Sequence, residues 1–462
     1  MARDLGTSLN SPGWAASAIV AAGVTALFTF PTWPGLMSYD SHVAYQQSRE
    51  GVFSMLWPPL HAYLFTLARS VGADIWGLFV TQTFLLFAAA NLVIHMLTPG
   101  RRLAAGLSVC FALAFIYIPT LLGSVFAHWR DTPTASFAVL GLALWLLAAR
   151  YRAGWLLPVA VLAFAVAVGL RYNAFVLVAF VMALMVWSPL LDGRGGRGAR
   201  AMVAVALVAG LALAWGSTQW RLPDLRRMPN PGNLAGTQLF DVIGISACAD
   251  RNFLPPEVSG GRAISAYHVR RAYDPRHLQL ALADKPGQPM LKESGAKADI
   301  PGVWRRAVLA EPVCYLDHRR LVAIELMGMS KAAVYYPVHA TIDVNAYGLK
   351  LTRPRATFAA VAYIERNAPE GWRRPYLLYL GALLATAAAL ALRRPAAPLM
   401  AALMAGVLAY PALLFLAAPA ADARYIFPSS VMALLLMVAG TGVVLGPRLA
   451  ERSSSRGKAA TR

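Results

Sequence analysis

Apolar residues along this chain form long runs, and short polar stretches separate one run from the next. About ten of these runs are roughly 16 to 25 residues long, which is the length a helix needs to cross a bilayer. No small-residue cleavage site follows the first run, so we interpret it as a retained helix rather than a signal peptide. The predicted spans are residues 14–34, 74–97, 104–122, 134–149, 154–170, 173–191, 201–216, 375–392, 397–418 and 426–445.

The pattern therefore predicts an all-α, polytopic membrane protein with about ten transmembrane helices. Hydrophobic residues make up 58% of the chain and charged residues 14%, whereas a soluble domain has about half and a quarter. A formal net charge of +20 often indicates nucleic-acid binding. Much of this excess lies in short loops between apolar runs, where arginines set topology, so nucleic acid is not a predicted partner.

Arginines in the short loops predict how the chain is oriented. Cytoplasmic loops of membrane proteins are enriched in lysine and arginine. If the N-terminus is cytoplasmic, an even number of spans places every arginine-rich loop and the basic tail on that same side. We therefore expect both termini in the cytoplasm and a location in a bacterial-type cytoplasmic (inner) membrane. The loop arginines concerned are Arg101, Arg102, Arg150, Arg152, Arg194, Arg197, Arg200, Arg393 and Arg394.

Two outer segments stand apart from the spans. Residues 35–73 form a first outer loop, in which Leu60–Ala68 is predicted as an interfacial helix that begins after two prolines. A longer polar segment is predicted as an extracytoplasmic, mostly α domain inserted before the last three helices, and residues 301–330 have a helical pattern. The predicted organisation is a seven-helix membrane domain at 1–216, the outer domain at 217–374, C-terminal membrane helices at 375–446 and a basic cytoplasmic tail at 447–462.

The cysteines allow one disulfide. Cys110 lies inside an apolar run, whereas Cys248 and Cys314 both lie in the predicted outer domain. An oxidising compartment would permit these two to pair. Two buried free thiols are the alternative.

Acidic residues beside the predicted outer ends of helices are the first candidates for chemistry. Asp40 follows the first span in Ser-Tyr-Asp-Ser, Asp131 precedes the fourth in His-Trp-Arg-Asp-Thr-Pro, and Glu50 lies in the first outer loop. A carboxylate that is partly desolvated at that depth can act as a general base for a hydroxyl or amine. The structural alternative for Asp131 is that it caps the fourth helix.

Arginines on the same face form the second group. Arg171 precedes the sixth span and Arg424 the last, where neither serves the positive-inside rule. An arginine at membrane depth usually has a partner or a task, and a guanidinium group matches the oxygens of a phosphate. The structural alternative pairs Arg424 with Asp422, and Arg171 with an acid such as Asp131.

Histidines on this face are weaker candidates. His61 and His128 can orient a phosphate or a hydroxyl, although a lone histidine beside aromatic residues is more often interfacial. Metal-ligand spacing, a glycine-rich phosphate loop and a nucleophile elbow are all missing from the sequence. No metal site, nucleotide or redox cofactor is therefore predicted, although a divalent metal remains open.

These residues, in this order, resemble motifs of the GT-C superfamily of membrane glycosyltransferases, which includes the protein O-mannosyltransferases and the aminoarabinose transferase of lipid A. The resemblance covers the membrane part, about two thirds of the chain. The family's His-Pro-Pro-Leu-Tyr stretch has Trp57 at its first position here, and its paired acids after the first helix reduce to Asp40. The matching motifs are Asp40 in GLMSYDSHVAY, Trp57-Pro58-Pro59-Leu60-His61-Ala62-Tyr63, Arg130-Asp131-Thr132-Pro133, Arg171-Tyr172-Asn173-Ala174 and Arg424-Tyr425-Ile426-Phe427-Pro428.

The resemblance implies a GT-C-like fold and a glycosyltransferase that uses a polyprenyl-phosphate-linked sugar as donor. The sugar would move by inverting displacement to an extracytoplasmic lipid, glycan or protein acceptor, without a nucleotide. Asp40 and Asp131 would be catalytic, with Asp40 as the general base, and Arg171, Arg424, Arg130 and His61 would hold the donor phosphate. Further candidates are Tyr39, Glu50, His128 and Tyr425.

Three other functions compete with this one. A lipid or glycan transporter or flippase would have charged or broken helices near the midplane and internal symmetry, and here the acids gather at one face instead. An O-antigen-ligase-like enzyme would use arginine and histidine in place of an aspartate base. A non-catalytic assembly protein is the third alternative.

Overall fold

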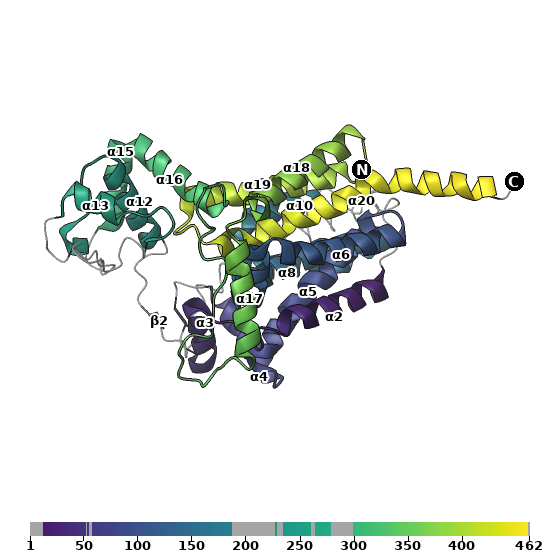
Figure 1. Ribbon diagram of the computed structural model, residues 1–462, viewed down its shortest axis with the longest axis horizontal. Helices are drawn as coiled ribbons and strands as arrows, with labels where there is room; N and C mark the ends of the chain where they lie inside the picture. Colours follow the sequence, from purple (N-terminus) through teal and green to yellow (C-terminus); the bar gives the residue numbers. More distant parts are fainter. Residues whose placement is uncertain are drawn as a thin grey trace.

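A computed structural model describes residues 13–51, 53–54, 58–186, 227–228, 234–259, 264–278 and 299–460 of this chain. Apolar helices lie side by side in one bundle, and a smaller group of helices projects from one end of it (Figure 1). Apart from one pair of two-residue strands, the elements of the described residues are helical. The helices of the bundle are α2 (Trp14–Thr29), α5 (Asp74–Leu97), α6 (Arg101–Tyr117), α7 (Pro119–Phe126), α8 (Asp131–Tyr151), α9 (Leu156–Leu170), α10 (Ala174–Val186), α18 (Tyr376–Ala391), α19 (Ala397–Ala417) and α20 (Phe427–Ala460).

Several of these helices are compatible with a multi-pass membrane protein. Within the described ranges, four are long and apolar enough to cross a membrane, at Asp74–Leu97, Asp131–Tyr151, Ala397–Ala417 and Ala423–Pro447. Shorter apolar helices occupy the predicted spans at 14–34, 154–170, 173–191 and 375–392. The predicted span at 201–216 lies outside the described residues. The number of crossings and the orientation of the termini remain predictions.

The outward faces of the bundle carry large apolar side chains. Five examples, exposed by between 56% and 71%, come from α2, α6, α9 and α18. Soluble monomers rarely leave so many such residues on neighbouring surfaces, whereas lipid would cover them. These five are Ile19, Leu27, Leu113, Leu162 and Leu384.

The predicted span at 104–122 is not a straight helix. α6 and α7 meet at a bend of 87°, where Ile118 takes an extended conformation with φ −105° and ψ 94°. Pro119 explains the bend, because a proline disfavours helical geometry in the residue before it and has no N–H to continue the ladder. The predicted single span is corrected to a broken pair.

The described part of residues 35–73, the predicted first outer loop, contains two helices, one more than the sequence predicted. α4 (Leu60–Ser70) is the helix that the sequence predicted here, and it begins after Pro59 as expected. Its interfacial position remains a prediction. α3 (Tyr39–Glu50) was missed because its sequence, YDSHVAYQQSRE, has no apolar stripe. Ser38 precedes α3, and Gly51 ends it in the left-handed conformation that favours glycine, at φ 66°. Asp40 therefore lies in the first turn of a helix and not in a loop.

The elements in the described parts of residues 217–374, the predicted outer domain, are mostly α-helices, as predicted. α12 (Ala235–Cys248), η2 (Pro256–Ser259), α13 (Ala266–Ala272), α15 (Ile300–Ala310) and α16 (Pro312–Leu326) form the group that projects from the bundle. The helical pattern at 301–330 is broken at Glu311, because Pro312 starts a new helix. α17 (Pro354–Asn367) instead packs on α7, and η3 (Gly371–Arg373) follows it. β1 (Phe53–Ser54) pairs in parallel with β2 (Arg227–Met228).

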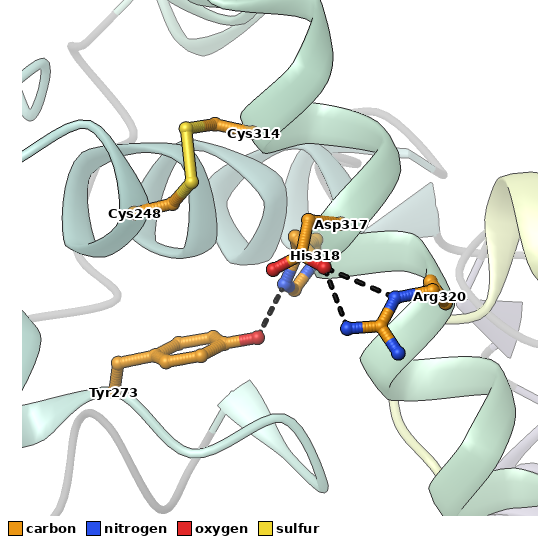
Figure 2. Close-up of a disulfide and its surroundings, with 6 residues drawn as sticks. All are labelled: Cys248, Tyr273, Cys314, Asp317, His318 and Arg320. Carbon is orange, nitrogen blue, oxygen red and sulfur yellow. Dashed lines mark hydrogen bonds and ion pairs between the residues drawn. A yellow bond between two sulfur atoms is a disulfide. The ribbon is translucent and has the colours of Figure 1, made fainter.

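A disulfide and a buried charge cluster hold the projecting group together. Cys248 and Cys314, the pair that the sequence left open, join α12 to α16 with their Cα atoms 5.5 Å apart (Figure 2). One turn further along α16, the ring of His318 points from the helix toward Tyr273. The Tyr273 hydroxyl lies 2.8 Å from Nδ1 of His318. On α12, Asp241 forms an ion pair with Arg319 at 2.7 Å, and both side chains are almost fully buried.

Arg319 also links this group to the bundle. Its guanidinium donates a hydrogen bond of 2.8 Å to the carbonyl of Ala418, the residue that ends α19. The next residues are held in the same way, because Ala421 donates its N–H to the Arg276 carbonyl at 2.6 Å and Ala423 donates to the Tyr335 carbonyl at 3.2 Å. The projecting group and the segment after it therefore fix the backbone that leads into η4 (Ala423–Ile426), which carries Arg424.

Candidate functional site

Three stretches of backbone that are distant in sequence meet beside the start of α3. Leu36 donates its N–H to the Phe126 carbonyl at 2.8 Å and accepts a hydrogen bond from the His128 N–H at 2.8 Å. Met37 pairs in the same way with the segment around Ile342. One short strand-like segment, Leu36 and Met37, therefore contacts both of the other stretches. These contacts fix the relative positions of three parts of the chain: the region around residue 40, the start of α8 and the 341–343 segment.

Gly35 makes this approach possible. It takes φ +111°, and a Cβ atom at this position would overlap the ring of His128. The Nε2 atom of that ring lies 3.0 Å from the carbonyl oxygen of Pro34. A side chain at position 35 would therefore push the first outer loop away from α8.

Asp40 and Arg424 form an ion pair at the centre of this arrangement. Asp40 Oδ2 lies 2.8 Å from an Arg424 guanidinium nitrogen, and 29% of the Asp40 side chain is exposed. The Nε of Arg424 contacts Asp422 at 3.3 Å, and its Cζ lies 5.1 Å from the centre of the Trp129 ring. The indole of Trp129 donates a hydrogen bond of 3.0 Å to the Ser38 hydroxyl.

The charges around Asp40 decide its protonation state. Burial alone would raise the pKa of Asp40, but the positive charges of Arg424 and two neighbouring arginines outweigh it and hold that pKa below its ordinary value. Asp40 is therefore a carboxylate at neutral pH and can accept a proton. Its basicity is low while Arg424 remains its partner.

A second ion pair lies next to the first. Arg171, at the C-terminal end of α9, forms an ion pair with Asp131, whose side chain is 1% exposed. Asp131 is the first residue of α8, as the helix-start alternative expected, although no side-chain hydrogen bond caps that helix. The pairing alternative also matches the structure. Tyr425 lies between the two pairs, with its ring centre 4.7 Å from the Arg171 Cζ and 5.3 Å from the Arg424 Cζ.

A narrow pocket opens between these elements. Its free space is small, with room for about one water molecule. Asp40 and Arg424 line one part of it, and His61 of α4 lies in its wall with an Nε2 atom that is buried without a hydrogen-bond partner. The lining residues are Asp40, Ser41, Ala44, Pro58, His61, His128, Trp129, Arg130 and Arg424.

Most of the candidates from the sequence come together here, and two do not. Glu50 lies at the far end of α3, where it accepts hydrogen bonds from Gln46 and from the Tyr347 hydroxyl at 2.8 Å. Tyr39 is 67% exposed and does not line the pocket. The candidates that gather around the pocket are Asp40, His61, His128, Arg130, Asp131, Arg171, Arg424 and Tyr425.

A group of residues beside the pocket was missed from the sequence. The segment after α16 places Tyr336 against Trp129, with 5.7 Å between the ring centres. The Tyr336 hydroxyl lies 2.6 Å from Nδ1 of His339, whose Nε2 lies 3.0 Å from an Asp343 carboxylate oxygen. These residues are in an irregular, polar stretch, and only the His-x-x-x-Asp spacing would have drawn attention to them.

Two buried histidines at the site, His61 and His128, predict how stability depends on pH. Burial lowers the pKa of His61 to about 3 and that of His128 to about 4. An unfolded histidine titrates near 6.5, so below that pH the unfolded chain binds more protons than the folded one. Stability is expected to fall as the pH drops from 6.5 toward these values, by a few kcal/mol in total.

Thermal unfolding in detergent between pH 7.5 and 4.5 measures this effect. We expect a falling midpoint in the wild type and a shallower fall in His61→Asn, which has no imidazole to protonate there. His268→Asn, at the surface of the outer segment beside Ser265, serves as the control and should keep the wild-type slope. Equal slopes in wild type and His61→Asn would contradict the prediction.

Within the described residues, no group of three or more His, Cys, Asp or Glu side chains is placed to hold a metal ion.

Comparison with protein-family models, with curated proteins and with solved structures finds no significant match to this chain.

Proposed function

We propose that this protein is an integral-membrane glycosyltransferase that moves a sugar from a polyprenyl-phosphate donor to an extracytoplasmic acceptor. The observation that carries the proposal is the contact of a partly exposed carboxylate, Asp40, with a guanidinium, Arg424, in a pocket that Arg130 also lines. A base and phosphate-binding cations are the two requirements of such a transfer.

In the proposed reaction, the acceptor oxygen forms a bond to the anomeric carbon while its proton passes to the Asp40 carboxylate. The bond from that carbon to the phosphate oxygen breaks, and its electron pair leaves with the phosphate. Arg424 and Arg130 stabilise the growing negative charge and need no proton donor. We assign Asp131 and Arg171 a positioning role, because their ion pair is buried. Arg171 holds the ring of Tyr425 beside Arg424.

Donor binding would also activate the base. Arg424 lowers the pKa of Asp40 more than any other charge around it. A donor phosphate that draws Arg424 away would raise the pKa of Asp40 and make it a stronger base. The carboxylate would then be most basic when the leaving group is in place.

An apolar groove next to the pocket supports a lipid-linked donor. It lies between α4, α5 and the start of α8, and its empty space, including the open side, is about 720 Å³. α4 connects the two sites, because its first turn carries His61 in the pocket while Leu64, Leu67 and Ala68 line the groove. A polyprenyl chain in this groove would place its phosphate near the arginines.

A photoreactive polyprenyl-phosphate analogue tests the proposal. We expect crosslinks to α4 and the first turns of α8, with labelling lowered about fivefold to tenfold in Leu67→Trp, because the larger side chain would fill the groove. Leu67 is 62% exposed, so the substitution does not disturb the core. Leu113→Trp, at a similarly exposed position on α6, is the matched control. Crosslinks confined to other helices would overturn the proposed donor site.

A further inference from the structure

The side chains of Tyr336, His339 and Asp343 form a hydrogen-bonded relay with a defined direction. The Nε2 of His339 lies 3.0 Å from the Asp343 carboxylate, which can only accept, so Nε2 carries the proton. The Nδ1 of the neutral ring is then an acceptor, and the Tyr336 hydroxyl donates to it at 2.6 Å. Because the only proton of that hydroxyl is committed, the lone pairs of Tyr336 Oη are able only to accept.

The protonation states support this direction. Burial lowers the pKa of His339, and the Asp343 charge opposes the shift only in part, so the ring is neutral at pH 7. Burial raises the pKa of Tyr336 to about 12, which keeps its hydroxyl protonated. Two other charged or titratable groups interact with His339. Arg424 of η4 lowers the pKa of His339, and His339 in turn lowers the pKa of His42 on α3.

The relay lies directly beside the Asp40–Arg424 pair. Tyr336 packs on Trp129, which also lies against the guanidinium of Arg424. Asp343 donates its N–H to the Met37 carbonyl at 3.1 Å, three residues before Asp40. Tyr336 also has a positive φ of 50°, which costs free energy for a large side chain and is often retained where function requires it.

We propose that this relay is the acceptor side of the site and that it binds a carbohydrate. The inference rests on the proposed function and names its acceptor class. Tyr336 Oη needs a ligand that donates a hydrogen bond, while Asp40 needs a hydroxyl proton of its own. A sugar supplies both from neighbouring hydroxyls, whereas a serine or threonine side chain has only one hydroxyl and would need a backbone N–H for the other contact. Tyr335 and Tyr336, partly exposed with ring centres 6.2 Å apart, offer apolar faces for the sugar ring.

Saturation-transfer NMR on the full-length protein in nanodiscs tests the proposal. The probes are the methyl glycosides of glucose, galactose, mannose and rhamnose at millimolar concentration, with n-propanol as the single-hydroxyl control. We expect at least one glycoside to bind the wild type and n-propanol not to bind. Tyr336→Phe keeps the ring and removes the acceptor oxygen, so its affinity should fall about tenfold. Tyr267→Phe, at a 52% exposed position on α13 in the projecting group, is the matched control and should bind as the wild type does.

A second variant guards against a folding defect in the first. Asp343 is 40% exposed, and Asp343→Asn removes the carboxylate that fixes the His339 tautomer, so a smaller loss of glycoside binding is expected. No binding by the wild type, unchanged binding by Tyr336→Phe, or equal binding of n-propanol would overturn the inference. The donor photolabelling is independent of this result. Glycoside binding without donor labelling would therefore contradict the proposed function and not the carbohydrate site.

Discussion

Replacing Asp40 by asparagine is expected to lower sugar transfer by about 10²- to 10⁴-fold while the protein still folds. The amide has the size of the carboxylate but cannot accept the acceptor's proton. Arg424 keeps Asp422 as a partner at 3.3 Å, so its charge is not left uncompensated. The measurement is the incorporation of labelled sugar into envelope material, with the amount of membrane-inserted protein determined in parallel.

Asp250→Asn is the control for this experiment, because that carboxylate is 65% exposed and pairs with Arg270 in the projecting group. It should transfer sugar at the wild-type rate. If Asp40→Asn retained turnover within about tenfold, the aspartate base would be wrong. An O-antigen-ligase-like mechanism, based on arginine and histidine, would then explain the site better.

That Asp40 and Arg424 lie at the same end of the bundle could be predicted from the order of the apolar runs. Their direct contact could not, because it also depends on the backbone pairing of Leu36 and Met37 and on the contacts that fix the start of η4. Both residues lie just outside apolar runs, and the arginine-rich loops assign those two ends to the same face. The structure brings the two side chains to 2.8 Å although almost the whole chain separates them. Positions along a helix bundle follow from hydropathy because each apolar run fixes where its ends lie.

The group beside the pocket could not be predicted because no periodic pattern marks it. Tyr336, His339 and Asp343 lie in an irregular segment whose position is set by backbone pairing with Met37 and by packing on Trp129. The helix that carries Asp40 was missed for a related reason, since its few apolar residues form no continuous stripe. Hydropathy also gave no warning of the bend between α6 and α7, which depends on the single residue Pro119.

Replacing Arg171 by methionine is expected to be the most destabilising change at the site. It would leave the Asp131 carboxylate, 1% exposed, without its counter-charge, and the loss of one partner from a buried pair typically costs 3–5 kcal/mol. One Asp131 oxygen already has no hydrogen-bond partner in the structure, so nothing nearby would compensate. The measurement is the thermal unfolding midpoint in detergent, which should fall by many degrees.

The double variant Asp131→Asn with Arg171→Met separates structure from chemistry. Removing both charges together should recover most of the lost stability, because no buried charge is then unpaired. Sugar transfer decides what else the pair does. If the double variant is stable and transfers sugar normally, the pair is a structural element alone. If it is stable and transfers poorly, Arg171 acts on the reaction, through Tyr425 or on the donor phosphate itself. A double variant as unstable as the single one would contradict the pairing that the structure shows.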